Sequence, residues 1–284
     1  MSLTKSSWAI TDTINPKVLH DFQSIIGSKL STSHIQSNNK FLMPGSHLLY
    51  FNSSYSKLDK DGYFNSQTPS MLLDKPDLTF RRRLWSKGDI TFKQQLKFGS
   101  VYTCTEKVKH CKRIKDNYYV GIERLIRPYN CSANTESSDN SDYCIKETRW
   151  LTYTNLPPVI YKVNRGVDKN LLKRIGEFQF EDIDILRYGQ LTLNPHRIHW
   201  DKNYSCSVEK YDNIIAQGPL IVQALIDIFN KHFTNLQFQI KSIKYKNVNN
   251  LYPDTRALVS LEKAEDDVFN LYLTDEKWLP YMQQ

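Results

Sequence analysis

The stretch Ile214-Ile-Ala-Gln-Gly-Pro-Leu-Ile221 opens the longest apolar helix that the sequence predicts. Pro219 occupies a first-turn position, where proline is favoured, and the apolar pattern continues to about Phe233. Strand patterns follow the helix at 236–245, Arg256–Glu262 and Val268–Leu273. One central helix followed by a run of antiparallel strands is an α+β pattern, in which a sheet wraps one helix.

The first half of the chain contains a similar run of strand patterns, and we expect a tandem duplication although no residue-level repeat is visible. The predicted strands of this half are Thr91–Leu96, Ser100–Lys115, Tyr118–Pro128 and Cys144–Thr154. The Ser/Asn/Asp-rich segment Asn130–Asp142 predicts a surface loop between two of them. The sequence Asn155-Leu-Pro-Pro158 breaks the strand pattern. We therefore predict an N-terminal repeat at 1–155, a linker at 156–175 and a C-terminal repeat at 176–284.

An amphipathic helix is predicted before the first strand run. Asn15 suits the N-cap, Pro16 suits the first helical position, and apolar residues follow at helical spacing. We expect a helix that packs on the fold rather than a targeting segment. Residues 1–27 contain no arginine and do contain Asp12 and Asp21, whereas a mitochondrial presequence is rich in arginine and poor in acidic residues.

Composition excludes several classes of protein. Of 284 residues, 40% are apolar, which is enough for a core and excludes intrinsic disorder. The most apolar stretch, Gly218–Phe229, is interrupted by Gln223 and Asp227, so we expect no membrane span. The net charge of +8 permits a nucleic-acid or phosphate partner, but the lysines are scattered rather than clustered. Five irregularly spaced cysteines without a C-x-x-C pair predict a reducing compartment, with neither a disulfide framework nor a zinc ribbon.

Candidate catalytic residues gather in Tyr188-Gly-Gln-Leu-Thr-Leu-Asn-Pro-His-Arg-Ile-His-Trp-Asp201, just ahead of the apolar helix. His199 has a side chain that exchanges protons near neutral pH. Gly218 lies at the helix start, where backbone N–H groups have no partner in the helix. Such an N–H beside a histidine suits a reaction in which a carbonyl is polarised while a base moves a proton. The sequence contains no nucleotide, metal or serine-hydrolase motif, and we expect no cofactor and no metal.

This segment resembles the hydratase-2 motif of MaoC-like hot-dog proteins, which runs Asp-Phe-Asn-Pro-x-His-x-Asp and is followed by a His-Gly helix start. The resemblance places His199 on the motif histidine, Asn194 on the motif aspartate and Gly218 on the oxyanion-hole glycine. Gln217 replaces the usual histidine before that glycine. The sequence of this segment resembles the fungal mitochondrial 3-hydroxyacyl-thioester dehydratases more closely still. The N-terminal signatures of these enzymes resemble Met43–Phe51, Arg81–Gly88 and Glu147–Thr154.

The resemblance implies a double hot-dog fold, with two antiparallel sheets each wrapped on a central helix and one working site in the C-terminal repeat. It implies dehydration of a (3R)-3-hydroxyacyl thioester in mitochondrial type-II fatty acid synthesis, with Asn194, His199 and Gly218 as catalytic residues. Arg197 is a candidate for binding the thioester or pantetheine. The implied substrates are acyl groups on acyl carrier protein or coenzyme A, and either a monomer or a homodimer is compatible with the fold.

Other interpretations remain open at this point. Hot-dog folds also support thioester hydrolysis, although Asn194 removes the obvious carboxylate base. A non-catalytic module that binds an acyl carrier or RNA through its positive charge is a third possibility. Asp201 is expected to be structural, while His196 and Arg197 also suit a solvated loop. The cluster Arg81–Arg83 suits a solvated strand end, or a binding site for phosphates or an acidic carrier.

Overall fold

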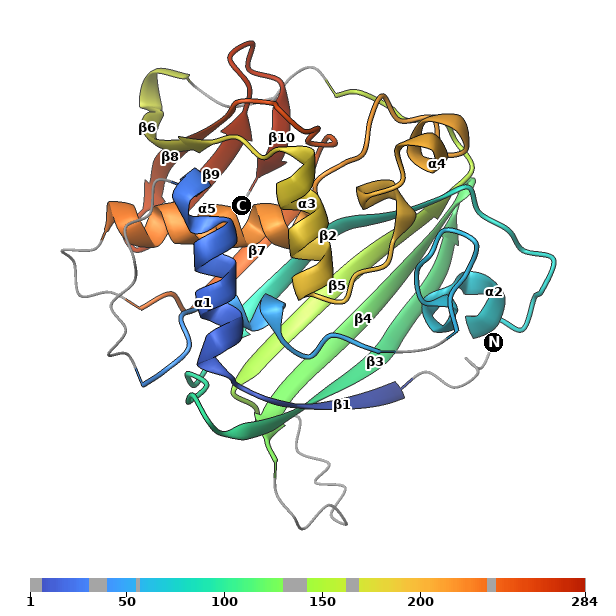
Figure 1. Cartoon of the computed structure of the whole chain (residues 1–284), viewed down its shortest axis with the longest axis horizontal. Coiled ribbons are helices and arrows are strands. Elements are labelled where there is room, and N and C mark those ends of the chain that lie inside the picture. The colour runs from blue at the N-terminus through green and yellow to red at the C-terminus, as the bar shows by residue number, and fades with distance from the viewer. Residues whose placement is uncertain are drawn as a thin grey trace.

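The computed structural model of the chain describes residues 7–30, 40–54, 57–129, 142–161, 169–233 and 239–283. Its main feature is one antiparallel sheet of ten strands in the order β1-β3-β4-β5-β2-β7-β10-β9-β8-β6 (Figure 1). The strands are β1 Ser7–Thr13, β2 Arg82–Phe92, β3 Val101–Ile114, β4 Asn117–Pro128, β5 Ile145–Thr154, β6 Lys173–Phe178, β7 Ser242–Asn247, β8 Ala257–Glu265, β9 Val268–Thr274 and β10 Pro280–Gln283. The helices are α1 Pro16–Ile25, α2 Pro69–Leu72, α3 Asp182–Leu191, α4 Lys202–Ser207 and α5 Gly218–His232.

The two halves of the chain build the same half-sheet. From the centre outward, the first half contributes β2, β5, β4, β3 and β1, and the second contributes β7, β10, β9, β8 and β6. Each strand of the first half has a counterpart at the same place in the chain order of the second half. The duplication is therefore evident in the topology, although the residues show no repeat. The two predicted sheets are continuous, because β2 pairs with β7 and places Ile90 opposite Ile243.

Helix α5 lies where the sequence predicts it and packs almost entirely inside the protein. Nine of its residues are buried, and their apolar side chains belong to a core that includes Phe22 of α1 and Ile90 of β2. The predicted N-terminal helix is also confirmed as α1, with the Asn15 side chain accepting a hydrogen bond from the Lys17 N–H. The first half contributes this shorter helix rather than one of α5's length. Within the described residues, no helix is long and apolar enough to span a membrane.

Several predicted boundaries differ from the structure. Strand β2 spans Arg82–Phe92, so the predicted strand Thr91–Leu96 was wrong except at Thr91 and Phe92. Arg82 and Arg83 are buried in the protein and not solvated as the sequence suggested. Strand β6 begins at Lys173, within the predicted linker. Strand β1 at one edge of the sheet and strand β10 between β7 and β9 were not predicted. The expected loop at Asn130–Asp142 lies almost entirely outside the described residues.

Candidate active site

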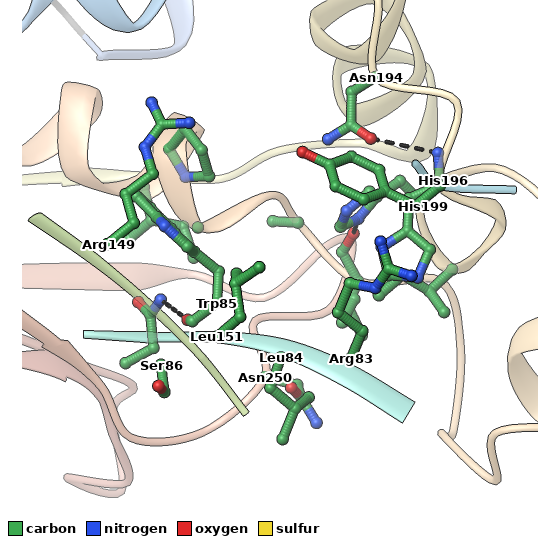
Figure 2. Close-up of a pocket in the computed structure, with 18 of the residues that line it drawn as sticks. Arg83, Leu84, Trp85, Ser86, Arg149, Leu151, Asn194, His196, His199 and Asn250 are labelled. Carbon is green, nitrogen blue, oxygen red and sulfur yellow. Dashed lines mark hydrogen bonds between the residues drawn. The ribbon is translucent and has the colours of Figure 1, made fainter. Parts of the chain in front are cut away.

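A cavity of about 190 Å³ lies at the junction between the two halves and is lined by three of the predicted site residues: Asn194, His199 and Gly218. Figure 2 shows Asn194 and His199 on one side of the cavity, and Trp85 of β2 and Arg149 of β5 on the other. The motif comes from the second half of the chain and the wall from the first. The structure therefore forms one site from both halves.

His199 is buried and held in one orientation. Its Nδ1 lies 2.8 Å from the carbonyl oxygen of Ile215, and a carbonyl only accepts hydrogen bonds, so Nδ1 carries the proton. In the neutral ring, Nε2 then keeps its lone pair. Burial lowers the pKa of His199 to about 4, although the hydrogen bond to Ile215 opposes the shift. The imidazole is consequently neutral at pH 7 and able to accept a proton.

Short backbone contacts position this histidine. A turn at Arg197–His199 brings the ring toward the segment that precedes α5, and the Ile215 N–H donates to the Ile198 carbonyl at 3.0 Å. Upstream, Leu193 adopts a left-handed backbone with φ of 50°, and the next residue's N–H donates to the Gly189 carbonyl. These contacts connect the motif to α3 on one side and to α5 on the other.

Asn194 presents a hydrogen-bond donor to the site. Its Oδ1 accepts the backbone N–H of His196 at 3.1 Å, an Asx-type turn that uses the oxygen of the amide (Figure 2). The amide group Nδ2 is therefore the part available to a ligand. An aspartate in this place would offer a second acceptor, whereas Asn194 offers an N–H.

Gly218 begins α5, and its N–H is one of the groups that a helix start leaves without an intrahelical partner. Pro219 follows and has no N–H to compete. Neighbouring side chains also leave no room for a Cβ at this position. A Cβ at this position would lie 2.1 Å from Cε3 of Trp85 and 2.9 Å from Nδ2 of Asn247.

Arg197 does not line the cavity. Its guanidinium donates to Oδ2 of Asp201, at 2.7 Å from Nη2 and 3.1 Å from Nε, and lies 4.1 Å above the ring of Tyr204. Asp201 also caps α4 by accepting the Tyr204 N–H at 2.9 Å, in agreement with its expected structural role. The geometry gives Arg197 a structural partner and does not bring it to the predicted site.

Two other motif residues are buried and anchored. Gln217 is fully buried, and its Nε2 donates to the carbonyl oxygen of Ile185 at 2.8 Å, which fastens the start of α5 to α3. His196 lines the cavity and is 5% exposed, so its expected place in a solvated loop is wrong. Its ring packs edge-on against His199, with centroids 5.3 Å apart.

Two charged residues of the cavity wall, Glu106 and Arg149, were not predicted as site residues. Behind them, Arg124 bridges Glu106 at 2.7 Å and Glu147 at 2.8 Å, and Arg149 also pairs with Glu147. Burial alone would raise the pKa of Glu147, but Arg149 and Arg124 lower it to about 2. The only sequence signal for this network was the resemblance of Glu147–Thr154, which contains Glu147 and Arg149, to a family signature.

Comparison with solved structures identifies the class of protein. A MaoC-like dehydratase from Phytophthora capsici superposes with a TM-score of 0.70 at 12% identity, covering 98% of this chain and 93% of that one. A Mycobacterium tuberculosis protein described as a double hotdog fold gives a TM-score of 0.60 at 10% identity, covering 100% and 95%. The fold is thus the predicted α+β double hot-dog.

Sequence comparison then identifies the family. The profile described as hydroxyacyl-thioester dehydratase type 2 matches residues 45–253. The mitochondrial hydroxyacyl-thioester dehydratase type 2 of Saccharomyces cerevisiae is 39% identical over 256 residues, covering 89% of this chain and 87% of that protein. Its Schizosaccharomyces pombe counterpart is 24% identical, with 84% of each covered. The chain belongs to the hydroxyacyl-thioester dehydratase type 2 family, and its enzyme class is that of the hydro-lyases.

Proposed function

We propose that the protein removes water from a (3R)-3-hydroxyacyl thioester to give a trans-2-enoyl thioester, and catalyses the reverse hydration. The observation that carries this proposal is the convergence of three groups on one cavity. These are the neutral imidazole of His199, the amide Nδ2 of Asn194 and the helix-start N–H of Gly218.

The first requirement of the reaction is to make the α-proton acidic. The N–H of Gly218 receives the thioester oxygen as negative charge develops there, and the N-terminus of α5 adds to its effect. Loss of one such donor typically costs about 2.7–4 kcal/mol in the barrier. The Nε2 of His199 then removes the α-proton, because its lone pair is the one that the bond to Ile215 leaves unused.

The second requirement is to protonate the departing hydroxyl group. Asn194 cannot supply a proton, but its Nδ2 donates a hydrogen bond that holds the hydroxyl oxygen. His199 returns the α-proton to that oxygen. The Cα–H and Cβ–O bonds break, a Cα–Cβ double bond forms, and water leaves. A single imidazole therefore serves as base and then as acid.

We further propose that the two halves of the chain have different roles in catalysis. The repeat at 176–284 carries the catalytic motif, while the repeat at 1–155 has no such motif and encloses the substrate. Support comes from the cavity wall, where the first half supplies Trp85, Ile122 and Leu151.

For the biological setting, we propose a mitochondrial matrix enzyme of type-II fatty acid synthesis. Both fungal relatives are named as mitochondrial proteins. The acyl group would arrive on acyl carrier protein or coenzyme A, and the net charge of +8 complements an acidic carrier or coenzyme A phosphates. A homodimer remains a prediction.

The test is hydration of crotonyl- and decenoyl-coenzyme A, followed by the loss of enoyl-thioester absorbance. Wild type is compared with His199→Ala and with His20→Ala, a matched control on the exposed side of α1. We expect a 3R alcohol from wild type and from the control, and a loss of about 100-fold or more for His199→Ala. Release of free thiol without hydration, or wild-type rates in His199→Ala, would contradict the proposal.

A further inference from the structure

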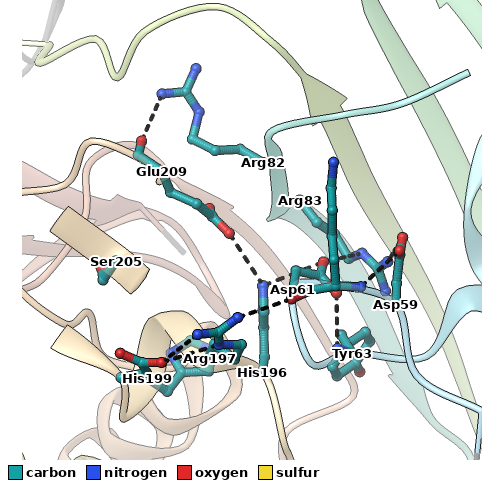
Figure 3. Close-up of polar contacts among 12 residues, drawn as sticks. Asp59, Asp61, Tyr63, Arg82, Arg83, His196, Arg197, His199, Ser205 and Glu209 are labelled. Atoms are coloured by element: carbon teal, nitrogen blue, oxygen red, sulfur yellow. Dashed lines mark hydrogen bonds and ion pairs between the residues drawn. The ribbon is translucent and has the colours of Figure 1, made fainter. Parts of the chain in front are cut away.

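A second histidine stands beside the catalytic one, and carboxyl groups face it from outside the cavity. Nε2 of His196 lies 3.6 Å from Oδ2 of Asp61 and 3.9 Å from Oε1 of Glu209 (Figure 3). Asp61 precedes β2, whereas Glu209 follows α4. Two distant segments of the chain thus place acidic side chains on the same edge of the His196 ring.

The two ring nitrogens of His196 have different surroundings. Nε2 is completely buried and makes no hydrogen bond with the described residues. His196 lines the cavity with His199. Nε2 is the nitrogen that lies next to the carboxyl groups, which leaves Nδ1 for a ligand in the cavity.

Charge decides which nitrogen carries the proton. Asp61 forms an ion pair with Nε of Arg83 at 3.3 Å, so its carboxylate accepts and does not donate. The separation of 3.6 Å between Nε2 and Asp61 exceeds hydrogen-bond length, but a carboxylate at this range still favours an N–H over a lone pair. The Nε2–H form of the ring results, and its lone pair lies on Nδ1.

The surrounding groups keep the ring neutral. Burial lowers the pKa of His196 well below its ordinary value, and the neighbouring His199 and then Arg83 lower it further. Burial raises the pKa of Glu209 to about 8, with Asp61 adding to the effect and Tyr204 opposing it. The charged and titratable groups that face this cluster are Asp59, Asp61, Tyr63, Arg82, Arg83, His199, Tyr204, Glu209 and Tyr211.

We propose that His196 is a further catalytic residue: its Nδ1 accepts a hydrogen bond from the substrate hydroxyl, or from the attacking water, that Asn194 holds from the other side. Asp61 is its positioning residue, because the carboxylate that Arg83 holds in place fixes the ring tautomer. This inference rests on the proposed dehydratase function. It accounts for the loss of the motif carboxylate, since the Oδ1 of Asn194 is already used by the His196 N–H and a different acceptor is needed.

The two histidines should consequently hold opposite tautomers, His199 with the proton on Nδ1 and His196 with the proton on Nε2. We would record two-dimensional NMR spectra of protein labelled with nitrogen-15 histidine at pH 7.5, and assign the two rings with His196→Asn and His199→Ala. The same tautomer in both rings, or a charged His196, would overturn the proposal.

Activity supplies the second test. His196→Ala should lower kcat for hydration of crotonyl-coenzyme A about 100-fold with a smaller change in KM. His196→Asn should recover much of this loss, because the asparagine oxygen lies close to the position of Nδ1. Asp61→Asn presents an amide N–H to Nε2, reverses the tautomer and should cost about 10-fold. His110→Gln, on the exposed face of β3, is the matched control.

The outcomes separate the two proposals. If wild type hydrates the thioester and His199→Ala does not, but His196→Ala retains full kcat, only the role of His196 is overturned. If wild type shows no hydration, the proposed function itself fails. Thermal unfolding of each variant identifies a loss of fold, and in that case the NMR tautomer of the wild-type protein decides the question.

Discussion

Replacing Gly218 by alanine tests the oxyanion donor with a single methyl group. The new Cβ would lie 2.1 Å from Cε3 of Trp85, far inside contact distance. Trp85 has little room to retreat, because its ring packs against Tyr245 with centroids 4.7 Å apart and its carbonyl oxygen accepts a hydrogen bond from Asn247. We therefore expect the start of α5 to shift away from the cavity wall.

The expected size of the effect follows from the role of the N–H. A shift that removes this donor from the thioester oxygen costs about 2.7–4 kcal/mol in the barrier, or roughly 100- to 1,000-fold in kcat. Trp85→Leu removes the ring atom that meets the methyl group. The double variant Gly218→Ala with Trp85→Leu should therefore be more active than Gly218→Ala alone, a coupling that independent sites would not show.

The assay is the initial rate of enoyl-coenzyme A hydration, with thermal unfolding measured for each variant. Gly99→Ala is the control, because its backbone has φ of 78° and nothing lies within 4 Å of the added Cβ. That variant should lose stability through backbone strain and keep its kcat. A Gly218→Ala enzyme with the kcat of wild type would refute the assignment of this N–H to the thioester oxygen.

Three further predictions concern charge. Burial lowers the pKa values of His47 and His199 to about 4 in the folded protein. Their contribution to the unfolding free energy is therefore fully present above pH 6.5 and is lost as the pH falls toward 4, by up to about 3 kcal/mol for each ring. Denaturant unfolding at pH 7.5 and at pH 5 measures this loss, and equal unfolding free energies would contradict it. Glu147→Gln removes the carboxylate that pairs with Arg149 and leaves Arg124 with Glu106 alone, which should cost about 3–5 kcal/mol in unfolding free energy. A loss below 1 kcal/mol would mean that the pairs are solvated. Arg197→Ala should keep kcat and KM while lowering stability by about 1 kcal/mol, and a large rise in KM would return Arg197 to the substrate site.

Local signals were enough for two of the helices, α1 and α5. Asn15 and Pro16 predicted the start of α1, and Pro219 predicted the start of α5, because caps and prolines act within one turn of the chain. The pairing of β2 with β7 had no such local signal. It depends on two segments that are distant in the sequence, and only the completed sheet shows which edges meet.

The same reason limited the prediction of the site. Asn194, His199 and Gly218 lie in one motif and its helix, and the structure brings them to one cavity. His196 resembled a solvated loop residue because nothing nearby in the sequence offers it a partner. Its partners are Asp61 and Glu209, which reach it through the tertiary fold.

The buried arginines illustrate a related difficulty. Arg82 and Arg83 suggested a solvated strand end, since basic side chains are rarely buried alone. In the structure, their partners come from segments that are distant in the sequence. Arg83 donates to the Phe64 carbonyl at 2.7 Å and pairs with Asp61, while Arg82 is directed at the backbone oxygen of Glu209. Partners of this kind become visible only when the fold is known.

The most direct test of the account is the stereochemical course of hydration in deuterium oxide. If His199 alone transfers the proton, the α-deuteron and the hydroxyl group must be added to the same face of the enoyl thioester. We expect a 3R product whose α-deuterium is syn to the hydroxyl group, as read from proton coupling constants by NMR. Anti addition would require proton transfer from a second group on the opposite face, and it would contradict the central claim that one imidazole serves as both base and acid.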